Sequence, residues 1–170
     1  MVLKVKDSYR LEEKGRFFHV YILDESHCPI CQRLLMVRAI RKRVWWKGED
    51  NEDKYVMLIR RLYCEDCRKI HHELPDCLVP YKRYGAEVIE NTATALMPTA
   101  SCPPDTMRRI KAWWEAVKPY FLNILLILAE KNGVNFGRPP AFKETVRAVA
   151  NSNHWIFPWQ LCTCSASRRE

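Results

Sequence analysis

The feature that most constrains this chain is a pair of cysteine motifs, Cys28-Pro-Ile-Cys31 and Cys64-Glu-Asp-Cys67. A two-residue spacer lets one tight turn present two thiolates to the same ion, and two such turns supply the four ligands of a tetrahedral zinc site. The segment between the pairs must then run out and come back. The spacing therefore predicts a structural zinc site with Cys28, Cys31, Cys64 and Cys67 as its ligands.

The segment between the two pairs has the composition of a β-hairpin. Leu34–Trp46 and Tyr55–Tyr63 are rich in β-branched and aromatic residues, and the polar stretch 47–53 between them contains one glycine. A hairpin with one cysteine pair at the base of each strand is a zinc ribbon. The alternative is two unrelated thiol pairs or one redox pair, because CxxC motifs also serve oxidoreductases.

The residues after each second cysteine depart from the usual pattern of such knuckles. Glycine is common there because φ is positive, whereas this chain has Gln32 and Arg68. A positive φ at a non-glycine residue costs about 1–2 kcal/mol. Zinc binding contributes about 10–16 kcal/mol in small zinc-finger peptides, so the site tolerates this strain.

The other cysteines and the nearby histidines give a weaker signal. His71 and His72 follow the second pair closely, but four cysteines already complete the site, so a ligand role for either histidine is the lesser alternative. Of the remaining cysteines, we expect Cys77 and Cys102 to be buried thiols. We expect Cys162 and Cys164 to be free thiols.

Charge and hydropathy narrow the class of protein. The chain has 28 Lys and Arg residues against 20 Asp and Glu residues, which gives a formal charge of +8 and suggests a polyanionic partner. The longest apolar run, Ile124–Ala129, is far shorter than the ~20 residues of a membrane span. Met1–Glu13 mixes charges of both signs and has no signal-peptide pattern. We therefore expect a cytoplasmic protein, in which paired cysteines more often hold metal than form disulfides.

The second half of the chain has a helical pattern. Apolar residues recur at three- and four-residue steps in Arg83–Leu96, and a second helix is expected to begin near Pro103. Pro119 is expected to kink or restart that helix. Further helices fit Tyr120–Lys131 and Pro139–Ala150, and an aromatic segment follows them.

The helix that begins near Pro103 has an apolar face and a face with small and basic residues. Together with the preceding helix it fits a helix-turn-helix, in which the N-terminal residues of the second helix reach DNA base edges. Thr106, Arg108 and Arg109 are then the candidates for reading the groove. The alternative is an ordinary amphipathic helix pair with a solvated basic face, and the connection is longer than the usual three or four residues.

Several longer motifs resemble a family of bacterial proteins of unknown function that often occur with mobile elements. That family is similar to the zinc-ribbon and helix-turn-helix front end of insertion-sequence transposases. The resemblance implies this fold and a DNA-related context, and no established activity. It rests on these segments: 28–31, 60–67, 70–76, 79–84, 102–103, 106–110, 113–114 and 149–155.

The sequence thus predicts an α+β protein in which a small zinc-ribbon β-hairpin domain, residues 1–80, precedes an all-helical helix-turn-helix region, residues 81–170. We expect it to bind double-stranded DNA, with seven further basic residues contacting phosphates. They are Arg41, Lys42, Arg43, Arg60, Arg61, Lys82 and Arg83.

Two other classes of function compete with DNA binding. A transposase needs a ribonuclease-H-like sheet that the helical second half does not provide, and a closed four-cysteine site has no open position for a reactive water. We therefore expect no catalysis. The remaining alternative is a protein-interaction module that docks on another protein or on a second copy of the chain, for which the tryptophans and the acidic stretch 49–53 are suited.

Overall fold

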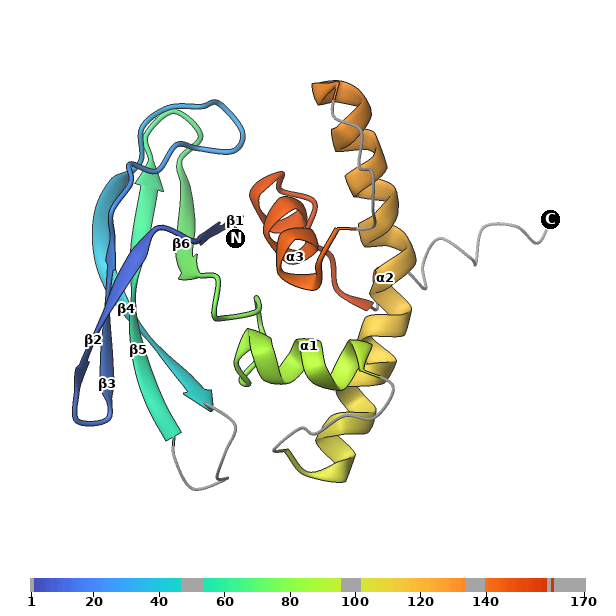
Figure 1. Ribbon diagram of the computed structural model, residues 1–170. Helices are drawn as coiled ribbons and strands as arrows, with labels where there is room; N and C mark the ends of the chain where they lie inside the picture. The colour runs from blue at the N-terminus through green and yellow to red at the C-terminus, as the bar shows by residue number, and fades with distance from the viewer. Residues whose placement is uncertain (1, 47–53, 96–101, 134–139, 159, 161–170) are drawn as a thin grey trace.

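The computed structural model describes residues 2–46, 54–95, 102–133, 140–158 and 160. Within them, six strands come first along the chain and three helices follow (Figure 1). The strands are β1 (Val2–Lys6), β2 (Tyr9–Lys14), β3 (Phe17–Ile22), β4 (Met36–Trp46), β5 (Lys54–Cys64) and β6 (Lys69–Pro75). The helices are α1 (Ala86–Thr94), α2 (Pro104–Asn132) and α3 (Phe142–Asn151).

The six strands form one sheet in the order β1-β6-β5-β3-β2, and β4 also pairs with β5. The β2–β3 hairpin turns at Gly15 and Arg16, where Gly15 has a φ of 62° that glycine adopts without steric strain. The hairpin of β4 and β5 is antiparallel, as the sequence predicts. The β1–β6 and β3–β5 pairs are parallel, so segments distant in the chain complete the sheet.

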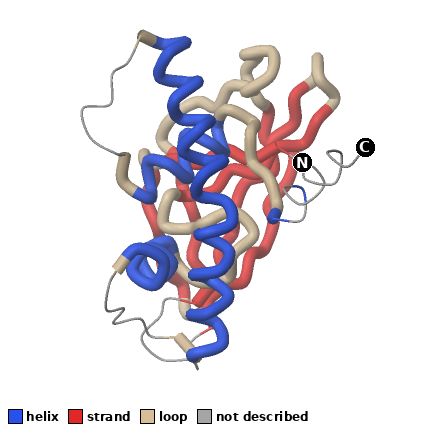
Figure 2. Tube along the Cα trace, turned by 90° about the vertical axis from the view of Figure 1, so that its right-hand side faces the viewer, coloured by secondary structure: helices blue, strands red, loops and turns tan. Residues whose placement is uncertain are grey.

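The helices cover one face of the sheet. Figures 1 and 2 show α1 and α3 between the sheet and α2, which runs along the outer side of the molecule. Asn151 at the end of α3 fixes this layer to the first strand, because it accepts from the Val5 N–H at 2.7 Å and donates to the Val5 carbonyl at 3.0 Å. None of the described helices combines the length and the apolar character needed to cross a membrane.

Three groups of buried side chains hold these layers together. The largest lies among the helices and is rich in aromatic rings, with Trp114 packed at 4.9 Å (centroid to centroid) on Phe142. The second lies between the sheet and the helices and includes Trp45 and Ala150. The third is small and surrounds the buried sulfurs of Cys28 and Cys64.

The predicted fold class is wrong. The cysteine-bearing hairpin is not a small zinc-ribbon domain, because β5 pairs along its length with β3, β4 and β6 and belongs to the six-stranded sheet. The error arises because no strand is predicted within residues 1–22, whereas these residues supply three strands. Whether residues 1–80 and 81–170 behave as separate domains stays a prediction.

The predicted all-helical helix-turn-helix region is wrong as well. α2 is one helix of 29 residues that passes through Pro119. Pro119 is exposed, and the buried stripe continues on either side of it from Val117 to Phe121. The apolar face predicted for the first part of α2 is buried, but it packs with α1 and α3 in the layer over the sheet.

Candidate metal centre

Two tight turns carry the four cysteines of the predicted metal site. In the first, the Gln32 N–H donates to the Cys28 carbonyl at 2.9 Å, and the Cys28 N–H donates to the Arg33 carbonyl at 2.8 Å. The second joins β5 to β6, and there Cys64 lies opposite Lys69. The hydrogen bonds of the first turn and the strand pairing at the second fold each cysteine pair back on itself.

The residue after each pair has a left-handed backbone, as the comparison with glycine-containing knuckles predicts. Gln32 has a φ of 62° and Arg68 a φ of 52°. Each conformation is unfavourable for a residue with a Cβ atom, by about 1–2 kcal/mol. The two turns therefore store strain next to the cysteines.

The four sulfurs converge on one point. Their Sγ atoms all lie within 4.8 Å of one another. The Cys28 and Cys67 sulfurs are 3.9 Å apart, and those of Cys31 and Cys64 are 3.4 Å apart. A tetrahedral ion with metal–sulfur distances of about 2.3 Å places its ligands about 3.8 Å apart, so the cluster has the dimensions to hold a metal ion.

The thiols interact strongly with one another. Burial raises the pKa of Cys28, but the backbone N–H groups of Cys31 and Ile30 lower it to about 7. The hydrogen bond with the Cys31 thiol, together with burial and the other sulfurs, raises the pKa of Cys67 to about 12. One thiolate forms readily, whereas further negative charge in the cluster needs a cation.

A network of buried polar side chains lies next to the cysteine cluster. Cys28 is fully buried, and its sulfur lies 3.7 Å from Nε2 of His71, which is also fully buried. The buried carboxylate of Glu73 accepts from Arg60 Nε at 2.6 Å and from the Ser26 hydroxyl. These contacts join the first cysteine turn to β5 and β6.

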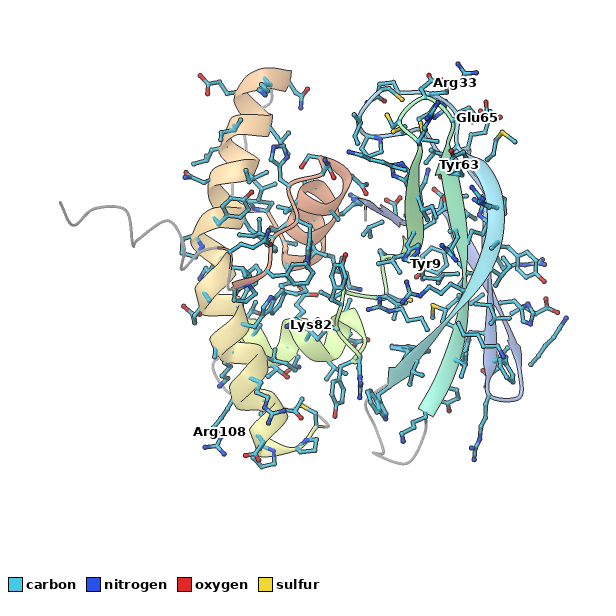
Figure 3. The ribbon with its side chains drawn as sticks, turned by 180° about the vertical axis from the view of Figure 1, so that it is seen from behind. Tyr9, Arg33, Tyr63, Glu65, Lys82 and Arg108 are labelled. Carbon is cyan, nitrogen blue, oxygen red and sulfur yellow. The ribbon has the colours of Figure 1, made fainter. Side chains whose placement is uncertain are left out.

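An exposed ion-pair group links the outer sides of the two turns. Nη1 of Arg33 lies 3.2 Å from the Asp66 carboxylate, and Nη2 lies 3.8 Å from that of Glu65. Figure 3 shows Arg33 and Glu65 close together at the end of the sheet. Because these groups are exposed, the pairs contribute little to stability.

Two cavities with basic linings lie on the face of the sheet that the helices partly cover. The first has a volume of about 250 Å³ and lies between β4 and the segment before α1. The second has a volume of about 570 Å³ and is lined from β4, β5, the second cysteine turn, β6 and the end of α3. His72 and Arg41 line both, and Arg41 Nη1 lies 3.2 Å from His72 Nδ1.

The structure brings most of the predicted phosphate-contacting residues to these cavities. The first is lined by Arg41, Lys42, Arg43, Lys82 and Arg83, and the second by Arg41 and Arg61. Arg60 is elsewhere, because neighbouring strand residues face opposite sides and its guanidinium pairs with Glu73.

Some of these basic groups also have structural partners. Arg43 Nη2 donates to the carbonyls of Val79 and Lys82 at 2.9 and 2.7 Å, and burial lowers its pKa to about 10. The Lys82 ammonium lies 4.0 Å from the centre of the Trp113 ring, and burial lowers its pKa to about 8. Both residues hold the segment before α1 in place.

The predicted groove-reading residues lie at a different part of the molecule. Thr106 is half-buried in the first turns of α2, Arg109 is exposed, and Arg108 pairs with Asp105. Figure 3 places Arg108 at the end of the molecule opposite Arg33 and Glu65. Since α2 does not belong to a helix-turn-helix, the fold no longer supports groove reading by these three residues, and their contact with DNA stays a prediction.

A family model for a domain of unknown function matches residues 28–113, just over half of the chain. The match begins at the first metal-site cysteine and covers both cysteine turns, the long hairpin and α1. The chain belongs to the DUF6431 family. No curated protein and no solved structure matches it.

The DUF6431 match contains the whole cysteine cluster and reaches into the first part of α2. It carries no link to transposases. In this DUF6431 chain the strands β1 to β3 and the helix α3 lie outside the match, although they complete the sheet and its cover. The cysteines Cys162 and Cys164, predicted to be free thiols, lie outside the described residues.

Sequence reasoning missed several residues of this DUF6431 site. Ser26 and Glu73 gave no signal, because their hydrogen bond joins positions far apart in the chain. Arg68 and Lys69 could have been found, since they directly follow Cys67 and the turn fixes where they lie.

Proposed function

We propose that this protein is a zinc-containing, DNA-binding protein that acts in the cytoplasm without catalysis of its own. Zinc suits the cluster, because four thiolates at tetrahedral spacing are the usual donor set of a structural zinc site. The motifs that resemble transposase front ends support a regulatory role associated with mobile elements. Duplex DNA is the partner that we infer.

The observation that carries the proposal is the first basic cavity. Five basic residues contribute to its lining, although the Lys42 side chain turns away so that its Nζ lies 5.7 Å from the centre of the Phe17 ring. None of the lining residues among the described part of the chain carries a carboxylate. The five basic residues come from β4 and from the segment before α1. A hydrogen bond joins this segment to β4, in which the Trp46 N–H donates to the Arg83 carbonyl at 2.9 Å. A fixed cluster of cations without carboxylates matches the spaced charges of a nucleic-acid backbone.

The test measures metal content and affinity for random-sequence duplex DNA across a salt series. We expect one zinc per chain and an affinity that falls steeply as salt rises. Replacing Arg41 and Arg83 together by Gln should weaken binding, and it should lower the salt slope by about one for each phosphate that the variant no longer neutralises.

The matched control removes the same charges from α2, as Arg108→Gln with Arg109→Gln. We expect it to bind almost as the unchanged protein does. An absence of DNA affinity at low salt, or an equal loss in both double variants, would overturn the proposal. A folded protein without zinc would overturn its metal part alone.

A second function, docking on another protein, is favoured by one observation. Apolar side chains next to the first cysteine turn are exposed, with Leu23 at 71% and Val37 at 56% exposure. Both line a cavity of about 320 Å³ together with Asp24 and Glu25. This function predicts that Leu23→Ser abolishes binding to the protein partner, whereas the double variant Arg41→Gln with Arg83→Gln keeps that binding.

A further inference from the structure

We propose that the second basic cavity is a binding site for a dianionic phosphate group, supplied as free phosphate or as the terminal phosphate of a nucleotide or oligonucleotide. Four basic residues contribute to the lining of the cavity, with His72 and Asn153 beside them. They are Arg41, Arg61, Arg68 and Lys69. None of the described residues that line it is acidic, so the charges of this lining are not balanced from within it.

The sheet and the metal turn hold these cations in fixed places. Arg61 lies directly opposite His72 in the β5–β6 register, and Arg41 reaches His72 from β4. Arg68 and Lys69 follow Cys67, so the cysteine turn determines where they enter the cavity. Arg41 and Arg61, which the sheet holds beside His72, can bind an anion with less loss of side-chain freedom than mobile surface residues.

One donor in this cavity lacks an acceptor. The Nε atom of Arg61 is buried and has no hydrogen-bond partner among the described residues. A buried charged donor that stays unpaired is costly, and an anion in the cavity would remove that penalty. His72 is neutral near pH 7 because burial and the nearby arginines lower its pKa to about 4, so it also offers a polar atom without competing charge.

A phosphate monoester fits this lining better than a carboxylate or a phosphodiester does. Its three unesterified oxygens can accept from several guanidinium groups at once, whereas a carboxylate or a phosphodiester offers two. The volume of about 570 Å³ lies in the usual range for small-molecule sites, so the cavity admits a group attached to the phosphate. Among the described lining residues there is no Phe, Tyr or Trp ring to stack on a base, so the phosphate is the part that we expect to be recognised.

This site shares Arg41 with the surface proposed to contact DNA, but the phosphate site and DNA binding are tested separately. General DNA binding depends on phosphodiesters along a duplex and on the first cavity. The phosphate site requires a preference for a terminal phosphate over a terminal hydroxyl. The two are therefore told apart by ligands that differ only in that group.

The experiment uses the full, metal-loaded chain and isothermal titration calorimetry. The ligands are inorganic phosphate, a short duplex with 5′-phosphates, and the same duplex with 5′-hydroxyls. We expect inorganic phosphate to bind, and Arg61→Gln and Arg68→Gln each to weaken that binding about tenfold. The matched control is Arg10→Gln, an exposed arginine on β2, which should leave binding unchanged.

Each outcome decides the proposal. Tighter binding of the 5′-phosphate duplex than of the 5′-hydroxyl duplex identifies nucleic-acid ends as the source, and binding of inorganic phosphate alone identifies the free ion. If the hydroxyl duplex fails to bind while phosphate binds, the proposed function fails and this site stands. Equal binding of both duplexes without affinity for phosphate, or equal losses in Arg10→Gln and Arg61→Gln, overturns the site. Metal content of each variant confirms that it has folded.

Discussion

Two non-glycine residues sit in left-handed backbone next to the metal-site cysteines. Gln32 and Arg68 occupy positions that glycine would take without strain, with φ values of 62° and 52°. Arg68 lines the second basic cavity, which gives its side chain a use there. Gln32 lines none of the described cavities, so the strain at Gln32 has no matching benefit in the structure.

The first prediction follows from this difference. Gln32→Gly should stabilise the protein by about 0.5–1 kcal/mol, because relief of the positive φ exceeds the added freedom of the unfolded chain. The measurement is the midpoint of urea unfolding with metal bound. Gly15→Ala is the converse control, since Gly15 has a φ of 62° and no atom within 4 Å of an added Cβ. That variant should be destabilised, and stabilisation by it would contradict the strain argument.

The second prediction concerns His72. Burial, with the charges of Arg41, Arg61 and Arg43, lowers its pKa to about 4 in the folded chain, against about 6.5 when unfolded. The unfolded chain therefore takes up the proton first, so the contribution of neutral His72 is complete above about pH 6.5 and is lost as pH falls toward 4. His72→Gln should lose less stability than the unchanged protein over this range in urea titrations.

The control for this pH effect is Leu126→Gln, which introduces the same residue without removing a titratable group. Leu126 is exposed on α2, outside the basic cavities. This variant should follow the pH profile of the unchanged protein. If His72→Gln also follows the pH profile of the unchanged protein, His72 does not resist protonation in the folded state.

At the scale of elements, the hairpin of β4 and β5 carries most of the site. Its inner strand, β5, has neighbours on both edges, and its two faces serve different purposes. Arg60 points to the buried carboxylate of Glu73 under the cysteine turns, whereas Arg61 lines the basic cavity. The alternation of one strand thus separates the support of the metal turns from the candidate anion site.

The third prediction tests this support. Arg60→Met leaves the fully buried Glu73 carboxylate without its cation, and breaking a buried pair in this way costs about 3–5 kcal/mol. The measurement is the free energy of unfolding at pH 7. Arg33→Met is the matched control, because Arg33 pairs with two exposed carboxylates and should be nearly neutral. Similar losses in both variants would show that the Glu73 pair has no special role.

Local patterns predicted the parts of the fold that depend on neighbouring residues. The cysteine spacing predicted the converging sulfurs, and the β-rich segments predicted the β4–β5 hairpin. Strand alternation would also have separated Arg60 from Arg61 once residues 55–63 were assigned to a strand. These features need only a turn or a single strand pairing.

The parts that depend on distant segments could not be predicted in this way. β1 pairs in parallel with β6, and β3 pairs in parallel with β5. Pairing between strands so far apart in the chain gives no recognisable pattern in the sequence of either strand. Pro119 predicts a break, but the buried residues around it continue one stripe, and tertiary packing keeps α2 intact. The hydrogen bond between Ser26 and Glu73 was missed for the same reason of distance.

At the scale of the whole molecule, the metal centre and the helical layer lie in different groups of buried side chains. The sulfurs belong to the small cluster with Leu35 and Leu62, whereas α1, α2 and α3 share the large aromatic cluster. α3 meets the sheet at β1, through the two hydrogen bonds between Val5 and Asn151. Loss of metal should therefore act unevenly on the molecule.

The fourth prediction is that metal removal loosens one end of the sheet first. After chelation, amide hydrogen exchange should rise in residues 26–35 and 60–73, while the middle of α2 near Phe121 stays protected. Cys64→Ser should reproduce this pattern, and Cys77→Ser, at a half-buried cysteine outside the cluster, should not. A uniform rise along the chain would show one cooperative unit, and no rise would show that metal is not structural.

The bond between Val5 and Asn151 joins positions 146 apart in the chain, and this separation has a consequence for synthesis on the ribosome. At ~5–20 residues per second, β1 emerges on the order of ten seconds before the helix that covers it. During that interval the edge of β1 is open to pairing with strands of other nascent chains. Production of this protein in the cell should therefore depend on chaperones that bind nascent chains early, even though the finished molecule has its first strand covered.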